Sequence, residues 1–318
     1  MILAMPERHR GDPVELRHLR YFIAVAEEGS LLTAAQRRLH TSQPSLSRQI
    51  RDLECEVGVK LLERQARGVA LTVAGKVFLD HARLALLQVE AAVDSARRAG
   101  QPEKPVLAMG FIAGQEVVWL PHVLRILREE APEAEITLCS QSSPELALGL
   151  MRGKLDVAFL RPEIGTVGLS FKVLAKEPLI AVLPADHRLT SRKKMRPHDL
   201  ASQIYVSSSR TSPVLESVIQ HYASSVGITL KAGYEGENLP SAMSLVTSTG
   251  GVTLIPLYAQ NMLTPNVVAR ALDGVPPTID LVLGYSSANT NPLLLRLLSR
   301  ADELVANVQD QSIIRYAI

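Results

Sequence analysis

The sequence predicts an α/β protein with a small, mainly helical N-terminal part and a larger part in which strands alternate with helices. The chain has 318 residues, a length typical of about two domains. In the first hundred residues, apolar side chains recur at helical spacing between short polar turns. After Pro105, short apolar runs alternate with amphipathic stretches, which is typical of a largely parallel sheet covered by helices.

Composition excludes several classes of protein. Hydrophobic residues make up 47% of the chain and the net charge is only +2, so the whole molecule is not a polybasic nucleic-acid binder. Cys55 and Cys139 lie outside any metal-binding spacing, so neither a metal site nor a cofactor is expected. Two lone thiols are typical of a reducing cytoplasm, and no apolar run is long enough to span a bilayer.

The N-terminal stretch "MILAMPERHRGDP" has too short an apolar part for a signal peptide. We expect residues 1–14 to form a disordered extension, because periodic sequence begins only at Glu15. A start at Val14 is a hypothesis that the intact mass of the natively expressed protein tests.

The next segment predicts two helices. The first has one apolar face, formed by Leu16, Leu19, Phe22, Ile23 and Ala26. Gly29 ends this helix and Ser30 can cap the second. The second helix is expected to face inward with Leu32, Ala35 and Leu39, and the small pair Ala34 and Ala35 lets another helix approach closely.

A polar turn, "HTSQP", leads into a third helix. Ser42 is a good N-cap, and Pro44 suits the first turn, where its missing N–H would be unpaired anyway. The apolar face is formed by Leu46, Ile50, Leu53 and Val57. The opposite side carries Pro44, Ser45, Arg48 and Arg51, with Ser47 at its flank. Such a helix can enter a major groove, where an arginine binds guanine through two hydrogen bonds.

Two further features orient this helix on DNA. Asp52, Glu54 and Glu56 gather at its C-terminal end and would repel phosphate there, so its N-terminal end is expected to enter the groove. The polar "ERQARG" between short apolar runs predicts a hairpin, or wing, with Arg64 and Arg67 at its tip. The alternative is a three-helix bundle whose charged face is only solvated.

A long helix is predicted from residue 73 to residue 99. Leu79, Leu86 and Val93 recur every seven residues, and Ala82, Val89 and Ala96 interleave with them. This pattern is typical of a two-stranded coiled coil that joins two protomers. The alternative is an amphipathic helix packed on its own domain. The stretch "GQPEKP", residues 100–105, then forms a hinge.

Beyond the hinge, ligands are expected at the carboxyl ends of the strands. Those ends are "GFIAGQE", "CSQSS", "LRP" and "YVSSSRTSP". Hydroxyls and a helix N-terminus after Ser212 suit a carboxylate, and Arg161 is the natural fixed charge for it. Phe111, Ile112 and Trp119 can hold a ring or a hydrocarbon body. Arg161 can instead pair with Glu163 or another acid, Trp119 can belong to the core, and serine runs can be solvated turns.

The stretch "ELRHLRYFIAVAEEGSLLTAAQRRLHTSQPSLSRQIRDLECEVGVKLLERQARGVALTVAG" closely resembles the N-terminal winged helix-turn-helix of LysR-type transcriptional regulators. Leu31 and Leu62 stand where that family often has Phe, and Cys55 replaces a usual Glu. The resemblance implies a winged helix-turn-helix over 15–72 and a dimerising linker helix over 73–99. The predicted DNA-binding residues are Thr33, Ser42, Gln43, Pro44, Ser45, Ser47, Arg48, Arg51, Arg64 and Arg67.

The stretches "GKLDVAFLRP", "LIAVLPADHRL" and "MSLVTSTGGVTLIP" resemble the effector domain of the same family. The resemblance implies a two-lobed α/β domain like a periplasmic binding protein over 106–308, followed by a tail at 309–318. Lobe I would comprise about 106–162 and 275–308, and lobe II about 163–274. The residues expected near the ligand are Ala113, Gln141, Ser142, Arg161, Ser207 and Ser208.

No GxSxG, HExxH or phosphate-loop pattern is present, so the chain is not expected to be an enzyme. The interpretation is a cytoplasmic regulator that binds an imperfect inverted repeat in double-stranded DNA and responds to a small carboxylated molecule, with an aromatic body as one option. A homotetramer and contact with RNA polymerase are implied by the family alone. The alternatives are a solute-binding module without a regulatory role and a constitutive DNA-architectural protein.

Overall fold

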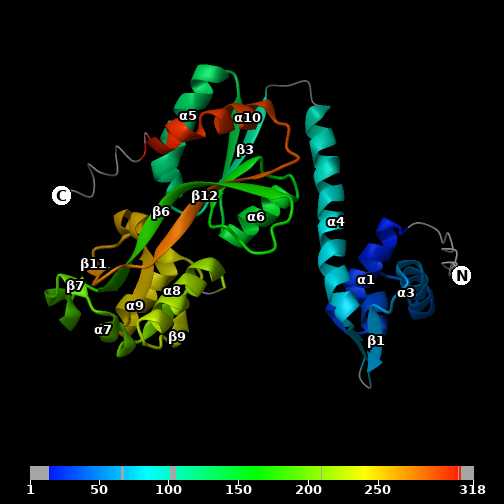
Figure 1. Cartoon of the computed structure of the whole chain (residues 1–318), viewed down its shortest axis with the longest axis horizontal. Helices are drawn as coiled ribbons and strands as arrows, with labels where there is room; N and C mark the ends of the chain where they lie inside the picture. Colours follow the sequence, from blue (N-terminus) through cyan, green and yellow to red (C-terminus); the bar gives the residue numbers. More distant parts are fainter. Residues whose placement is uncertain (1–13, 66–67, 101–104, 209, 307, 309–318) are drawn as a thin grey trace, which may run out of the picture. The chain divides into compact units, whose positions relative to one another are not determined.

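The computed structural model describes residues 14–65, 68–100, 105–208, 210–306 and 308. The chain divides into two compact units, one ending at Val93 and the other beginning at Asp94. Each unit is described by itself (Figure 1). Most of the predicted extension, Arg67, most of the predicted hinge and the predicted tail lie outside the described residues.

The first unit, here called the headpiece, is a winged helix-turn-helix. It comprises α1 (Leu16–Glu28), α2 (Leu31–Thr33), the π-helical η1 (Ala34–Arg38), α3 (Gln43–Val57), β1 (Leu62–Gln65), β2 (Gly68–Leu71) and the start of α4 (Val73–Ala99). β1 and β2 form an antiparallel hairpin, the predicted wing. The core joins all three helices of the motif through side chains that include Phe22, Ala34, Leu46 and Leu53.

The local signals at the helix ends are confirmed. Gly29 ends α1 in the left-handed region at φ 62°, where glycine has no Cβ to clash. The Ser30 hydroxyl accepts a hydrogen bond from the Thr33 amide at 3.3 Å. The Ser42 hydroxyl accepts one from the Ser45 amide at 3.3 Å, as expected of the N-cap of α3.

The inward face of the second helix differs from the prediction. Leu32 is 52% exposed, whereas Ala34 and Ala35 are fully buried. Helix α2 widens into the π-helix η1, in which the Leu39 amide donates to the Ala34 carbonyl at 3.0 Å. The buried pair therefore sets the face, and the expectation that Leu32 points inward is wrong.

The two ends of the long helix α4 differ in burial. Its first turns pack into the headpiece, where Leu79 and Ala82 are buried and Phe78 contacts Phe22 edge-to-face with ring centroids 5.2 Å apart. The prediction that Leu79 and Ala82 face a partner is therefore wrong, because their own domain already covers them. Val93 and Ala96, further along α4, are exposed.

The second unit contains one large sheet in the order β4-β3-β5-β12-β6-β11-β7, with β10 also paired to β6. Lobe I contains β3 (Val106–Phe111), α5 (Gln115–Glu130), β4 (Glu135–Ser140), α6 (Ser143–Met151), β5 (Val157–Leu160) and α10 (Pro292–Ser299). Strands β4, β3 and β5 are parallel, as the alternating pattern predicts. Helices α5 and α10 cover one face of this part of the sheet and α6 covers the other (Figure 1).

Two long strands join the lobes. These crossing strands are β6 (Leu169–Pro184) and β12 (Thr278–Ser286), and β12 pairs antiparallel with residues 169–178 of β6. Along β6, Leu174 belongs to the lobe I core and Leu179 to the lobe II core. Along β12, Leu281 belongs to the lobe I core and Ile279 to the lobe II core. The prediction of a largely parallel sheet therefore holds at the lobe I edge, but the centre is antiparallel because the chain returns between the lobes.

Lobe II completes the domain. It contains η2 (Arg188–Ser191), β7 (Lys194–Met195), α7 (Pro197–Ala201), β8 (Tyr205–Ser207), α8 (Pro213–Ser225), β9 (Ala232–Glu235), α9 (Leu239–Thr249), β10 (Thr253–Pro256), η3 (Leu257–Met262) and β11 (Val267–Leu272). In the part of the chain that the structure describes, no helix combines the length and apolar character needed to cross a bilayer.

Candidate functional site

The N-terminal end of α3 presents the predicted DNA-reading side chains to solvent. Ser42, Gln43, Pro44 and Ser45 are exposed, and Ser47 is half-buried at the flank. The Arg48 side chain is 77% exposed and its Nε lies 3.9 Å from the Asp52 carboxylate. A pair this long and this exposed contributes little to stability, so the Arg48 guanidinium is accessible at the surface.

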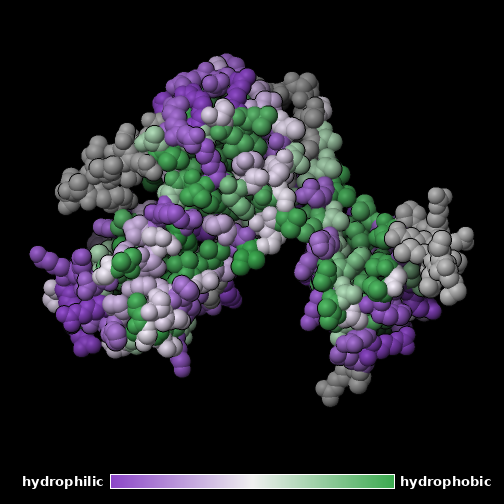
Figure 2. Space-filling view, in the orientation of Figure 1, coloured by the Kyte–Doolittle hydropathy of each residue, from purple (hydrophilic) through white to green (hydrophobic). Residues whose placement is uncertain are grey.

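The other predicted DNA contacts are less uniform. Arg51 folds back on its own helix, with Nε donating to the Ser47 carbonyl at 3.3 Å. Thr33 is half-buried beside its cap. Arg64 is exposed on β1, opposite Val69 of the wing. Hydrophilic side chains cover the end of the headpiece that carries β1 (Figure 2).

The three acidic residues near the C-terminal end of α3 do not form one exposed surface. Asp52 is exposed and Glu56 is half-buried, but Glu54 is only 6% exposed. Glu54 points into the headpiece and binds the segment that enters the wing. The expectation that all three acids repel phosphate is therefore wrong for Glu54.

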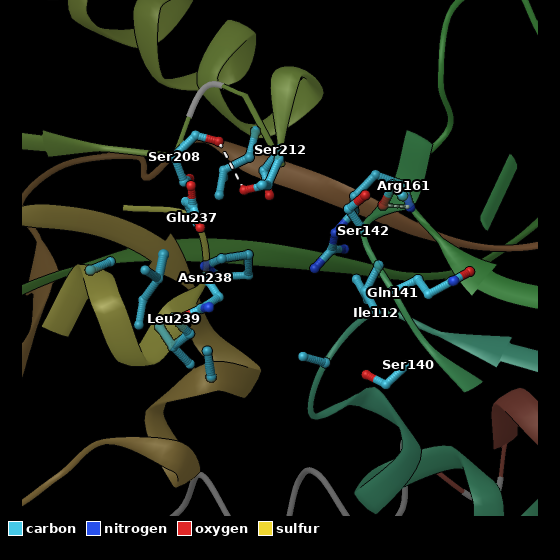
Figure 3. A pocket seen from close by; sticks show the side chains of 18 of the residues that line it. Ile112, Ser140, Gln141, Ser142, Arg161, Ser208, Ser212, Glu237, Asn238 and Leu239 are labelled. Carbon is cyan, nitrogen blue, oxygen red and sulfur yellow. Dashed lines mark hydrogen bonds between the residues drawn. The ribbon is translucent and has the colours of Figure 1, made fainter. Parts of the chain in front are cut away.

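A cavity of about 300 Å³ lies between the two lobes. Residues of lobe I and lobe II face each other across it (Figure 3). Its polar lining includes Ser140, Gln141, Ser142, Ser143, Arg161, Ser208, Thr211, Ser212, Glu237, Asn238 and Thr253. Its apolar lining includes Ile112, Leu215, Leu239, Ala242, Ile255, Pro256, Tyr258 and Ala259.

Five of the six residues predicted near the ligand line this cavity, namely Ala113, Gln141, Ser142, Arg161 and Ser208. Ser207 does not, because it is 2% exposed and its hydroxyl donates to Glu216 Oε2 at 2.9 Å. The same carboxylate oxygen accepts the Tyr205 hydroxyl at 3.0 Å. Ser207 points into lobe II because alternate side chains of a strand point to opposite faces.

The residues predicted to hold the apolar part of the ligand also differ in where they lie. Ile112 lines the cavity, whereas Phe111 and Trp119 belong to the core of lobe I. Most of the apolar lining comes instead from α9, β10 and η3, which sequence reasoning missed. These side chains lie far along the chain from the strand ends at which a ligand was expected. The N-cap Asn238 before α9 was the available local signal.

Arg161 is held by a buried polar network. Its Nη2 donates to Glu177 Oε2 at 2.5 Å, so the alternative of an acidic partner is confirmed, with Glu177 in place of Glu163. Gln115 Nε2 donates to the other oxygen of Glu177 at 2.8 Å. Trp119 Nε1 in turn donates to Gln115 Oε1 at 2.9 Å. These bonds orient the guanidinium, which is almost fully buried.

The network leaves one donor without a partner. Arg161 Nη1 is buried and has no hydrogen-bond partner among the described residues. A buried N–H group without an acceptor is costly, so an acceptor supplied by a ligand would stabilise this site. Helices α6, α8 and α9 also begin at the cavity with Ser142, Ser212 and Asn238, and helix N-termini favour negative charge.

Tyr258 connects the lobes at the cavity wall. The Arg161 guanidinium lies over its ring, 5.7 Å from the centroid. Its hydroxyl donates to the Ala113 carbonyl of lobe I at 3.0 Å. Burial raises the pKa of Tyr258 to about 12, so the phenol remains a donor at neutral pH. In this structure the cavity is therefore closed along one side by a contact between lobes.

The sequence matches two family profiles. The profile described as "Bacterial regulatory helix-turn-helix protein, lysR family" matches residues 16–76. The profile described as "LysR substrate binding domain" matches residues 100–304. The chain belongs to the LysR family. It is a DNA-binding transcription regulator with an effector-binding domain, and it is not an enzyme.

Individual relatives agree with this assignment. The Hca operon transcriptional activator HcaR of Escherichia coli is 39% identical over 93% of this chain and 99% of its own length. The regulator AlsR of Bacillus subtilis is 34% identical over 88% of this chain and 93% of its own length. Both are named regulators of transcription.

Solved structures of LysR regulators are also similar. Full-length CbnR in complex with its target DNA has a TM-score of 0.53 at 26% identity, covering 92% of this chain and all of CbnR. Full-length BenM has a TM-score of 0.54 at 27% identity, covering 92% of this chain and 97% of BenM.

Among the described residues, no group of three or more His, Cys, Asp or Glu side chains has the arrangement of a metal site.

Proposed function

We propose that this regulator responds to a small organic acid bound in the cavity between its lobes. The observation that carries this proposal is Arg161 Nη1, a buried donor without a partner among the described residues that line the cavity. A carboxylate supplies the acceptor that this donor lacks and also benefits from the helix N-termini around it.

The apolar wall argues for a compact hydrocarbon or aromatic body. Leu239 of lobe II lies across the cavity from Ser142 of lobe I (Figure 3), and Ile255 and Tyr258 add to the apolar lining. A cavity of about 300 Å³ is at the lower end of typical ligand pockets. The effector therefore carries one carboxylate-like end and a small apolar remainder, and polar groups around it fix its orientation.

Ligand binding is expected to act on the crossing strands. Arg161 follows β5 in lobe I, and its partner Glu177 lies on β6 where that strand passes from one lobe core to the other. An acid that binds Arg161 competes with or tightens this ion pair and so changes the relative stability of lobe arrangements. Regulation follows if the effector has different affinities for the two arrangements.

We further propose that two protomers associate through the exposed part of α4. Val93 and Ala96 remain exposed in the single chain, and Leu86 and Val89 are half-buried at the same repeat. A two-fold pair of headpieces suits an imperfect inverted repeat in a promoter. Assembly into a homotetramer, contact with RNA polymerase and residence in the cytoplasm are part of the same proposal.

Thermal-shift measurement on the full-length protein tests the proposal. A panel of small carboxylic acids, including benzoate, is added with matched neutral amides of the same carbon skeletons. At least one acid should raise the melting temperature in a concentration-dependent way while its amide does not. Ser208→Ala should reduce this shift, whereas the exposed Ser191→Ala, outside the cavity, should not. If the amides shift the melting temperature as much as the acids do, the carboxylate requirement is wrong.

The two alternatives make different predictions. A solute-binding module would bind the acid and ignore promoter DNA, and an architectural protein would bind DNA regardless of the acid. Measuring DNA affinity with and without the shifting acid separates both from an acid-controlled regulator.

A further inference from the structure

A buried carboxylate joins the recognition helix to the wing. Glu54 lies on α3 and is 6% exposed. Its Oε1 accepts the Leu61 amide at 2.9 Å and the Leu62 amide at 3.0 Å. Its Oε2 accepts the Lys60 ammonium at 2.6 Å. All three donors belong to the segment that enters β1, so one side chain holds the start of the wing against α3.

The second strand of the wing is held at a different point. The Val69 amide of β2 donates to the Gly29 carbonyl, at the end of α1, at 2.9 Å. A Cβ at Gly68 would lie 2.3 Å from this carbonyl oxygen, so only glycine permits the approach. The two wing strands are therefore attached to two different helices of the headpiece.

The base of the wing is closed by Thr72. Its hydroxyl donates to the Lys60 carbonyl at 2.8 Å and accepts the Gly75 amide at 2.9 Å. Glu54, Gly29 and Thr72 thus constrain the hairpin from three sides. The wing is a braced element and not a free loop.

Glu54 is suited to this role because it stays ionised. Burial by itself raises the pKa of its carboxyl, but the hydrogen bonds from Lys60, Leu62 and Leu61 outweigh burial, and the net pKa is lowered. Hydrogen bonds to a charged acceptor are shorter and stronger than those between neutral groups. The neutral amide of glutamine has one acceptor oxygen and cannot replace both carboxylate oxygens.

We propose that Glu54 is a positioning residue for DNA binding that never touches DNA itself. By holding Leu61 and Leu62 it sets the direction of β1, and therefore where Arg64 lies relative to the reading face of α3. Arg64 is only two residues beyond Leu62 on the same short strand, so a small rotation at the base displaces its guanidinium from the phosphate it meets. Glu54 thereby allows the helix and the wing to bind DNA together.

A double-mutant cycle on the full-length protein tests this role. DNA affinity is measured at several salt concentrations for wild type, Arg64→Ala, Glu54→Gln and the double variant. In the wild-type background, Arg64→Ala should weaken binding about tenfold and lower the salt slope by about one, as expected of a lost phosphate contact. In the Glu54→Gln background, Arg64→Ala should cost less than about twofold and leave the salt slope unchanged.

A purely structural role gives a different result. Glu54→Gln would then lower the melting temperature, but Arg64→Ala would cost the same factor and the same salt slope in both backgrounds, which overturns the proposal. Glu56→Gln, a half-buried position on the same helix, is the control and should leave the effect of Arg64→Ala intact. If Glu54→Gln does not fold, Glu54→Asp, which keeps the charge and shortens the reach, replaces it with the same two outcomes.

Discussion

The headpiece and the effector-binding unit place their functional side chains in opposite environments. In the headpiece, residues 42–48 are consecutive in the chain, and most of their side chains are exposed. In the effector-binding unit, Arg161, Glu177 and Tyr258 come from three separate elements and are largely removed from solvent. The predicted DNA-binding side chains are therefore mostly exposed to solvent, whereas the side chains around the cavity already contact one another in the protein without a ligand.

This difference follows from the cost of burying charge. Exposed groups such as Arg48 are hydrated in the free protein, so they need no protein partner there. A buried guanidinium must be paired, which is why Glu177 and Gln115 accompany Arg161. A variant at the DNA-reading surface is therefore expected to change binding alone, while one in the buried network changes binding and stability together.

The largest expected effect separates the two units. Phe22→Ala removes a fully buried ring that packs against Phe78, and it should lower the stability of the headpiece by about 3–5 kcal/mol. DNA binding should be lost, while the thermal shift given by the effective acid persists, because the second unit has its own cores. Leu32→Ala, at a position 52% exposed, is the control and should change stability by less than about 0.5 kcal/mol. Loss of the acid response in Phe22→Ala would show that the units do not fold independently.

The buried ion pair gives an effect of comparable size on the other unit. Arg161→Ala leaves Glu177 buried without its cation and should destabilise the effector-binding unit by about 3–5 kcal/mol in chemical denaturation. Replacing both groups, as Arg161→Met with Glu177→Leu, should restore most of that stability, because no unpaired charge remains. The double variant should still fail to respond to the acid. A normal response there would mean that Arg161 does not anchor the effector.

A smaller effect is expected at the DNA-reading surface. Arg48→Ala should weaken promoter binding by about 1–3 kcal/mol, measured by fluorescence anisotropy on DNA from beside its own gene. The melting temperature and the acid response should stay at their wild-type values, because the side chain is 77% exposed. Lys154→Ala, an exposed position in the effector-binding unit, should leave DNA affinity unchanged. Wild-type affinity in Arg48→Ala would show that the predicted register of α3 on DNA is wrong.

The smallest effect concerns acid stability of the headpiece. The Arg83 guanidinium, and after it Arg38, lowers the pKa of Glu27 against the opposing effect of burial. Because the folded pKa is below the unfolded one, the stabilisation is present above pH 4.5 and is lost as the pH falls through the folded pKa. The expected loss is about 1 kcal/mol or less, since the pair is partly exposed. Urea unfolding of wild type and Glu27→Gln on either side of pH 4.5 measures it, and parallel curves would remove Glu27 as the cause.

The sequence by itself determined the features that depend on neighbours along the chain. The caps at Ser30 and Ser42, the glycine end of α1 and the apolar face of α3 all follow from side chains within one or two turns. The strand ends that line the cavity were also predictable, because carboxyl ends of parallel strands meet at one edge.

Only the tertiary structure decided which face each of several ambiguous residues would take. The spacing of Leu79 and Ala82 fits a dimer repeat as well as it fits a headpiece core, but in the structure both side chains pack with Phe22 in the headpiece core. Ser207 and Ser208 are adjacent serines, yet the strand places one against Glu216 and the other at the cavity. Glu54 is one of three neighbouring acids, and only the wing distinguishes it. In each case the residue that each side chain contacts lies elsewhere in the chain. A polar group loses its water when it is buried, so the partner that it finds there determines whether burial is stable.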